Sequence, residues 1–190
     1  MKKLSLTIVL MLAAMVAAAQ EHIEFKWYGL YNVIDFSYGK NVNSKYDDVS
    51  MTQFTAVMGF QYRKETGVGL GVCFMSDGSN GYTQLPLFVE LRSHYLRSRL
   101  TPYTVVRAGY TLPLGESSGG TNAITIKKGG AYFGLEVGGR FAVSPKFGVS
   151  AHVRFSLLNM NEVEFCDKLG LAERHGVLFH VIGGGAGINF

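Results

Sequence analysis

Residues 147–157 read Phe147-Gly148-Val149-Ser150-Ala151-His152-Val153-Arg154-Phe155-Ser156-Leu157. The odd-numbered positions are all apolar, whereas the even-numbered positions carry glycine, serine, histidine and arginine. Successive side chains of a β-strand point to opposite faces, so this period of two predicts a strand with one apolar and one polar face. A helix would instead repeat its apolar residues every three to four positions.

The same alternation recurs along most of the chain. Between residues 52 and 63, for example, Phe54, Met58 and Phe60 fall on one face, while Gln53 and Gln61 fall on the other. We expect eight strands, over residues 24–38, 51–64, 66–76, 84–95, 101–111, 129–142, 147–158 and 174–190. The face assignment of the first strand is ambiguous.

The connections between these strands alternate in length. Tight connections at residues 64–66 and 144–146 contrast with long ones at 39–50, 112–128 and 159–173. Outer-membrane barrels have an even number of strands, short periplasmic turns and longer external loops. A soluble barrel would turn its apolar face inward and its charged face outward. Here we assign the face that carries glycine, glutamine and charge to the interior, so the apolar face points outward, toward lipid. The pattern predicts an all-β, eight-stranded, antiparallel up-and-down transmembrane β-barrel with both termini in the periplasm.

The polar face of such a barrel points into the lumen. Eight strands leave an interior just wide enough for side chains to fill. We expect a luminal polar network formed by charged side chains near the middle of their strands, namely Glu90, Arg92, Arg107, Glu136, Arg140, His152 and Arg154. Two acids face four arginines in this set, so the network is unbalanced and needs water, tyrosine or backbone partners.

The composition agrees with a membrane protein that has no spanning helices. The 190 residues are 47% hydrophobic and only 17% charged, yet one continuous apolar run exists, from Leu4 to Ala19. A spanning helix needs about 20 apolar residues, so a multi-helix membrane protein is excluded.

The amino terminus has the features of a secretory signal peptide. Lys2 and Lys3 precede the apolar run, and small residues end it at Ala19. We expect export through the Sec pathway and cleavage after Ala19, which leaves residues 20–190 as the barrel. Loss of two lysines lowers the formal net charge from +4 to +2. Basicity is therefore no argument for nucleic-acid binding, and none is expected.

The carboxyl terminus resembles the barrel-assembly signal of bacterial outer-membrane proteins. Phe190 ends an alternating strand and shares a face with Ile188. The segments Gln84–Arg92, Leu100–Tyr103 and Ala108–Tyr110 are also similar to the small porin-family barrels related to OmpA and OmpX. This resemblance implies a Gram-negative outer membrane location and recognition by periplasmic chaperones and the barrel-assembly machinery. It also implies contact with outer-membrane lipid and lipopolysaccharide, as a monomer.

Three functions are compatible with these residues. The first is a barrel with a side-chain-filled lumen, which presents external loops and has a structural or surface-interaction role. The second is a narrow channel for small solutes. The third is a lipid A-modifying enzyme using Ser156, His152 and Glu136, but the serine of the related deacylases lies two residues from the histidine and faces the membrane. We expect no enzymatic activity, no catalytic residues, no cofactor and no metal.

The two cysteines of the exported chain leave one question open. Cys73 and Cys166 are the only pair available for a disulfide in an oxidising compartment. Two cysteines give no recognisable spacing pattern, so the sequence does not decide whether they pair.

Overall fold

The computed structural model describes residues 29–43, 49–62, 65–77, 83–96, 98–114, 124–166 and 172–190. The expected signal peptide and residues 24–28 of the expected first strand lie outside this part of the chain. Within it, no helix is long and apolar enough to cross a membrane.

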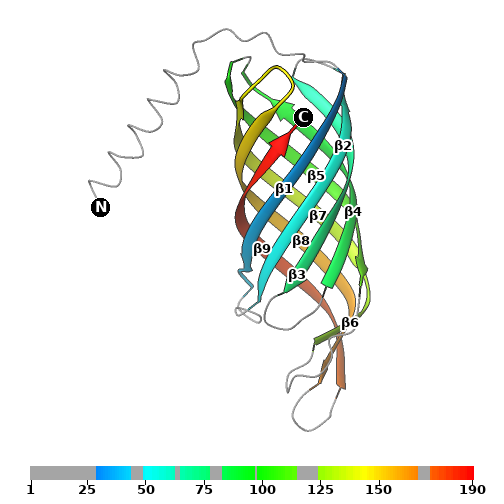
Figure 1. The fold of residues 1–190 in the computed structure, drawn as a ribbon. Coiled ribbons are helices and arrows are strands. Elements are labelled where there is room, and N and C mark those ends of the chain that lie inside the picture. Colours follow the sequence, from blue (N-terminus) through cyan, green and yellow to red (C-terminus); the bar gives the residue numbers. More distant parts are fainter. Residues whose placement is uncertain are drawn as a thin grey trace, which may run out of the picture.

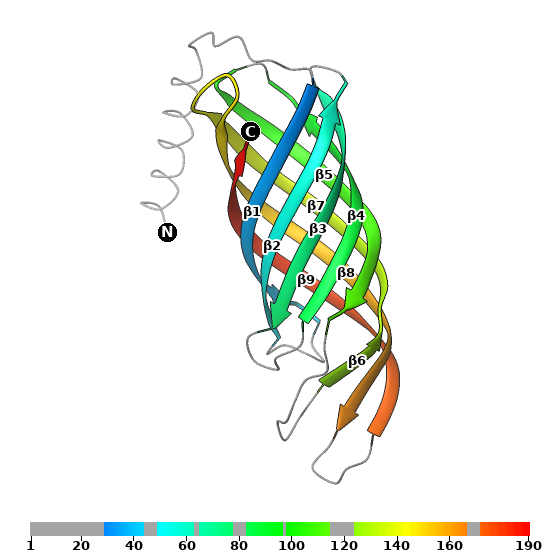
Figure 2. The same ribbon diagram turned by 45° about the vertical axis from the view of Figure 1, so that its right-hand side comes forward.

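The described residues form nine antiparallel strands, and eight of them close into a barrel (Figures 1 and 2). The strands are β1 Gly29–Asn41, β2 Ser50–Gln61, β3 Thr66–Asp77, β4 Thr83–His94, β5 Leu100–Pro113, β6 Ile124–Lys128, β7 Gly130–Ala142, β8 Gly148–Cys166 and β9 Ala172–Asn189. Each barrel strand pairs with the next one along the chain, with β7 following β5. Pairing of β1 with β9 closes the wall, so no barrel strand is left with an open edge. The predicted fold class is confirmed.

The two rims of the barrel differ. β1 begins and β9 ends at one rim, which we call the terminal rim, and the carboxyl terminus lies there (Figure 1). β1 ends and β9 begins at the opposite rim, which we call the loop rim. The connections 62–65, 95–99 and 143–147 return the chain at the terminal rim, and the longest connections lie at the loop rim.

Two of the expected long loops contain strands, so the predicted loop boundaries 112–128 and 159–173 were wrong. β6 pairs with the far end of β8, and β8 pairs with β9 as far as Cys166 opposite Ala172. These segments project from the loop rim as a three-stranded extension, made of β6, residues 162–166 and residues 172–175 (Figures 1 and 2). The register shifts between Met160 and Val163 and between Ile126 and Lys128, which interrupts the period of two that reveals a strand in the sequence.

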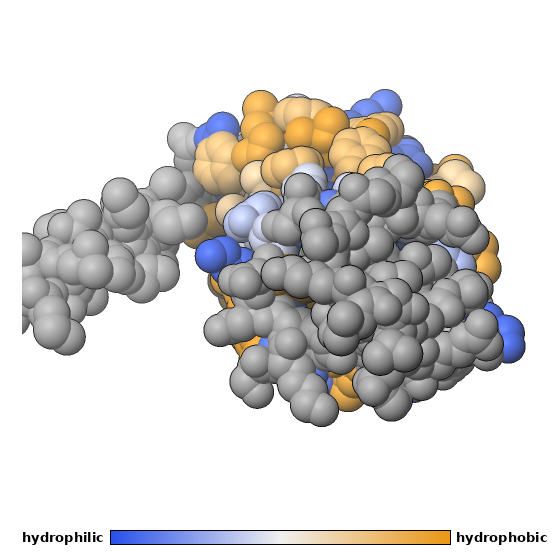
Figure 3. Space-filling view, turned by 90° about the horizontal axis from the view of Figure 1, so that it is seen from below, coloured by the Kyte–Doolittle hydropathy of each residue, from blue (hydrophilic) through white to orange (hydrophobic). Residues whose placement is uncertain are grey.

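The strands present apolar side chains outward and polar side chains inward, as predicted. Met58 and Leu70 are 64% and 67% exposed on the outer wall, whereas the adjacent Val57 is buried. Apolar side chains gather on the outer wall where it is visible from the loop rim (Figure 3). The ambiguous first strand is now assigned, because Asp35 and Ser37 are buried in the lumen. A continuous apolar outer wall is the surface that lipid requires.

The lumen is filled in layers. Toward the loop rim a group of inward side chains is apolar and buried, next to the buried polar side chains of Asp77 and Gln84. The apolar members include Val49, Met51, Met75, Leu158, Phe179 and Val181. We call this set the apolar layer. Apart from Asp77 at the loop-rim end of β3, the buried aspartate, glutamate and arginine residues lie between the apolar layer and the terminal rim. This arrangement places the candidate functional residues inside the wall, shielded from bulk water.

Candidate functional site in the barrel lumen

The first ion-pair group joins strands β4 and β5. The register of these strands sets Glu90 opposite Arg107, and both side chains point inward. Arg107 Nε donates to Glu90 Oε2 at 3.1 Å, and Arg92 Nε donates to Glu90 Oε1 at 3.0 Å. Tyr31 Oη of β1 also donates to Glu90 Oε1, at 3.2 Å. The carboxylate is therefore fully buried but surrounded by donors, which is the condition for tolerating a charge out of water.

The second group joins strands β7 and β8. Glu136 lies opposite Arg154 in the sheet register. Arg154 donates to Glu136 Oε2 from both Nε (2.9 Å) and Nη2 (2.6 Å). Arg107 Nη1 lies 2.9 Å from the same carboxylate oxygen, and Tyr103 Oη donates to Oε1 at 3.1 Å. Arg107 thus connects Glu136 to Glu90 and makes the two groups one network.

Asp35 is a member of this network that the sequence prediction missed. Arg154 Nη2 donates to Asp35 Oδ1 at 2.8 Å, and Arg107 Nη2 lies 3.6 Å from Oδ2. The printed sequence does contain a signal, since Val33, Asp35 and Ser37 alternate with Ile34, Phe36 and Tyr38.

The predicted charge imbalance disappears when Asp35 is included and when only the arginines with ion pairs to these carboxylates, Arg92, Arg107 and Arg154, are counted. The connected set, which we call the luminal network, has three carboxylates and three guanidinium groups. These are Asp35, Glu90 and Glu136 with Arg92, Arg107 and Arg154. Every member is 2% exposed or less. Balanced charge lets this many ions be buried together, because each is paired within the lumen.

Arg154 also donates hydrogen bonds to uncharged side chains across the lumen. Its Nη1 donates to Thr55 Oγ1 (3.0 Å), Gln53 Oε1 (3.2 Å) and Ser37 Oγ (3.3 Å). One side chain from β8 therefore bonds to β1, β2 and β7. Such cross-connections fix the relative positions of strands that are not neighbours in the sheet.

Arg140 lies apart from this network. It is on β7, closer to the terminal rim than Glu136, and it lines a pocket there together with Arg92 and His94. The sequence placed Arg140 on the correct face, but position along the strand separates it from the carboxylates. Its predicted role in the central network stays a prediction.

His152 lies between two carboxylates without bonding to them. Its Nδ1 is 3.8 Å from Glu136 Oε1, and its Nε2 is 4.0 Å from Asp35 Oδ1. Within the described part of the chain, neither His152 nitrogen nor the Ser156 hydroxyl has a hydrogen-bond partner. A serine nucleophile requires a bonded base, so the Ser156–His152–Glu136 triad is not assembled in this geometry.

Glycines of β9 make room for these side chains. β9 lies between β1 and β8, and Gly185 pairs with Ser37 on one side and His152 on the other. A Cβ added at Gly185 would collide with the carbonyl oxygen of Phe36 and come within 2.8 Å of His152 Nε2. A side chain at position 185 would displace these groups of β1 and β8, which explains why small residues line this part of the wall.

The carboxyl-terminal residues complete the barrel wall. Phe190 N donates to Asn32 O at 3.0 Å, and Asn32 N donates to Phe190 O at 2.7 Å. Ile188 pairs with Ile34 on one side and Val149 on the other. Both Phe190 and Ile188 have exposed side chains on the outer wall. Their predicted role in assembly is not tested by this geometry.

Cys73 is a free, fully buried cysteine and accepts a hydrogen bond from Thr55 Oγ1 at 3.4 Å. It therefore forms no disulfide in this structure. A cluster of three or more histidine, cysteine, aspartate or glutamate side chains suited to a metal ion is not found among the described residues.

Comparison of the sequence with family models and with curated proteins finds no match. Solved structures do match. The outer membrane protein OprG from Pseudomonas aeruginosa superposes with a TM-score of 0.61 at 15% identity, covering 89% of this chain and 99% of that one. Neisserial surface protein A (NspA) superposes with a TM-score of 0.60 at 13% identity, covering 85% of this chain and 96% of that one. The chain therefore has the eight-stranded β-barrel fold of these outer membrane proteins.

Proposed function

We propose that this protein is a small outer-membrane barrel whose lumen is closed by its own side chains and whose role is structural or based on surface interaction. The observation that carries the proposal is the luminal network, in which Arg154 and Arg107 bridge strands across the interior. Charge pairs buried this completely leave the middle of the barrel occupied rather than open.

A second obstruction supports the absence of a solute path. The apolar layer lies on the loop-rim side of the luminal network, and Met51, Leu158 and Phe179 are fully buried in it. A solute would have to pass both this layer and the ion pairs. We therefore favour the closed barrel over the narrow channel.

The three-stranded extension supports a surface role. The β8–β9 pairing continues well past the residues that contact β7, so the ladder reaches beyond the barrel wall. In the orientation expected from the sequence, this extension faces outside the cell. Segments that project beyond a rigid scaffold are often the ones that contact a partner.

We propose further that residues 1–19 direct export, that lipid and lipopolysaccharide surround the wall, and that periplasmic chaperones and the assembly machinery recognise Phe190. The lysines and apolar run of residues 1–19 support export, the exposed apolar band supports a lipid environment, and the place of Phe190 at the end of the wall supports its recognition. We also propose that the protein is not an enzyme, since Ser156 and His152 are not bonded to each other.

Two measurements on the mature protein test the closed barrel. Heat-modifiable migration on gels of purified outer membranes reports the folded barrel and its location. Planar-bilayer recordings, with a known open porin as the positive control, report whether ions pass through the lumen. We expect heat modifiability without stable conductance steps. Regular open steps from the folded protein would overturn the closed lumen.

The surface role and the orientation are tested by epitope tags. One tag is inserted within residues 167–171, beyond the extension, and the matched control is inserted within residues 143–147 at the terminal rim. We expect antibody binding to intact cells only for the first tag. Detection of the control tag alone would reverse the orientation and contradict a surface role for the extension.

A further inference from the structure

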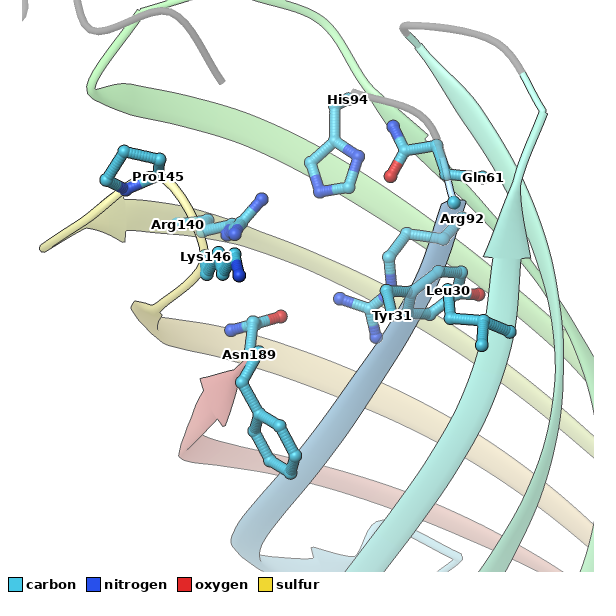
Figure 4. A pocket seen from close by; sticks show the side chains of 11 residues that line it. Leu30, Tyr31, Gln61, Arg92, His94, Arg140, Pro145, Lys146 and Asn189 are labelled. Atoms are coloured by element: carbon cyan, nitrogen blue, oxygen red, sulfur yellow. The ribbon is translucent and has the colours of Figure 1, made fainter. Parts of the chain in front are cut away.

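A small pocket opens at the terminal rim, where it borders the luminal network at Arg92 (Figure 4). Arg140, Lys146 and Asn189 line one side of it, and Arg92 and Tyr31 lie across from them. Its volume of about 70 Å³ is enough for several waters or one small polyatomic ion. The pocket is thus a defined space in which side chains from β1, β4, β7 and the 143–147 turn converge.

The charge of the pocket is strongly one-sided. Arg92, Arg140 and Lys146 contribute three cationic side chains, and no aspartate or glutamate is among the described lining residues. Phe190 also lines the pocket, and its carboxyl oxygen is engaged by the Asn32 N–H at 2.7 Å. Glu90 already pairs with Arg92, so Arg140 and Lys146 supply the further positive charge, and their convergence at a partly enclosed site creates a potential that attracts an anion.

Arg92 supplies a second, independent observation. Its guanidinium is 2% exposed and is held by the Nε bond to Glu90 and by stacking on the Tyr103 ring, with 5.0 Å from Cζ to the ring centroid. Its Nη1 and Nη2 atoms have no hydrogen-bond partner among the described residues. Buried donors are rarely left unsatisfied, and a fixed guanidinium edge with free donors matches the oxygens of an oxyanion.

We propose that this pocket binds a phosphate group. Several oxygens and up to two negative charges match three cations better than the single charge of a carboxylate does. The group could be supplied by inorganic phosphate or by a phospholipid headgroup, because the exposed side chains of Leu30 and Phe190 border the pocket on the lipid side. The inference rests on the barrel geometry and not on the proposed surface role.

Titration calorimetry on the refolded mature barrel, in a nonionic detergent without phosphate, tests the site. Inorganic phosphate and a short-chain phosphatidylglycerol are the two probes. Arg140→Gln and Lys146→Gln are the main variants, since both residues line the pocket, and Arg92→Gln is a third. Lys40→Gln, an exposed lysine at the loop rim, is the matched control for loss of one charge.

We expect saturable binding of at least one probe by the wild-type barrel and by Lys40→Gln. Arg140→Gln should weaken it by about tenfold or more, and Lys146→Gln, which is exposed, by a smaller and salt-dependent factor. Binding of inorganic phosphate would identify the free ion as a sufficient ligand, and binding of the lipid alone would identify the headgroup. Absence of saturable binding of both probes, or equal affinities for Arg140→Gln and Lys40→Gln, would overturn the proposal.

Discussion

Arg154 Nη2 donates to Asp35 Oδ1 at 2.8 Å, although the two residues are 119 positions apart and lie on strands that are not adjacent in the sheet. β9 separates β1 from β8, so the bond passes over the luminal face of β9. That face carries Gly183, Gly185 and Gly187. The small residues of β9 thus allow the charged side chains of its two neighbours to meet, and the ion pair in turn ties β1 to β8.

The first prediction concerns Glu136, which pairs with both Arg107 and Arg154. Glu136→Ala leaves these guanidinium groups buried with less compensating charge. Removal of one partner from a buried ion pair typically costs about 3 to 5 kcal/mol, so we expect the free energy of unfolding to fall by about that amount. Urea unfolding of the refolded barrel in detergent, followed by the loss of the heat-modifiable gel band, measures it.

Glu65→Ala is the matched control, because Glu65 is exposed at the terminal rim. Its unfolding free energy should stay within about 0.5 kcal/mol of the wild type. Equal stability of Glu136→Ala and the wild type would mean that the luminal network does not stabilise the barrel.

The second prediction tests whether Asp35 acts through Arg154. We expect Asp35→Asn and Arg154→Gln each to destabilise the barrel, with an interaction energy of about 1 kcal/mol or more in the double-mutant cycle. The coupling arises because each single change already removes their shared bond. As the control cycle, Asp35→Asn combined with Lys40→Gln should be additive. Additive effects of Asp35→Asn and Arg154→Gln would show that the two side chains do not interact in solution.

The face of each barrel residue was predictable, because the period of two is a local property of a strand. Asp35 was the exception, since the face of its strand was ambiguous in the sequence. Assignment of that strand needed its pairing with β9, which buries Val33, Asp35 and Ser37. The alternation from Val33 to Tyr38 is compatible with this assignment, but it does not by itself say which face points into the lumen.

The level at which each inward side chain lies along the barrel was less predictable than its face. Glu90 faces Arg107 and Glu136 faces Arg154 only because of the strand register. Register depends on where each turn begins and ends, and shifts by one residue reverse the faces. For the same reason the sequence grouped Arg140 with the network, although it lines the pocket at the terminal rim.

The third prediction separates two neighbouring glycines of β9. A Cβ at Gly185 would collide with the Phe36 carbonyl oxygen, whereas a Cβ at Gly184 would have its nearest contact at an ordinary 3.6 Å, to His152 O. We expect Gly185→Ala to lower the free energy of unfolding by about 1 to 3 kcal/mol through overpacking. Gly184→Ala should be neutral or stabilising by up to about 1 kcal/mol. The same urea titration compares the two variants. Equal stability would contradict the close approach of the Phe36 carbonyl oxygen and its neighbours to Gly185.

The fourth prediction concerns access to the lumen. Cys73 is fully buried beside Thr55 and belongs to the inward-facing core with Met75. In a Cys166→Ser background, we expect the folded barrel to resist a polar maleimide reagent and to react only after unfolding in urea. The lumen must open for the reagent to enter, since the thiol is fully buried and is bonded to Thr55, which also accepts a hydrogen bond from Arg154 of the luminal network.

Lys146→Cys in a background lacking both natural cysteines is the control for reagent access, because position 146 is exposed at the terminal rim. It should react at once in the folded state, as followed by the mass of the intact protein. If Cys73 reacted at a comparable rate in the folded barrel, solutes of the size of the reagent would reach the lumen. Such a result would favour the narrow channel over the closed barrel, because the same path would then be open to small solutes.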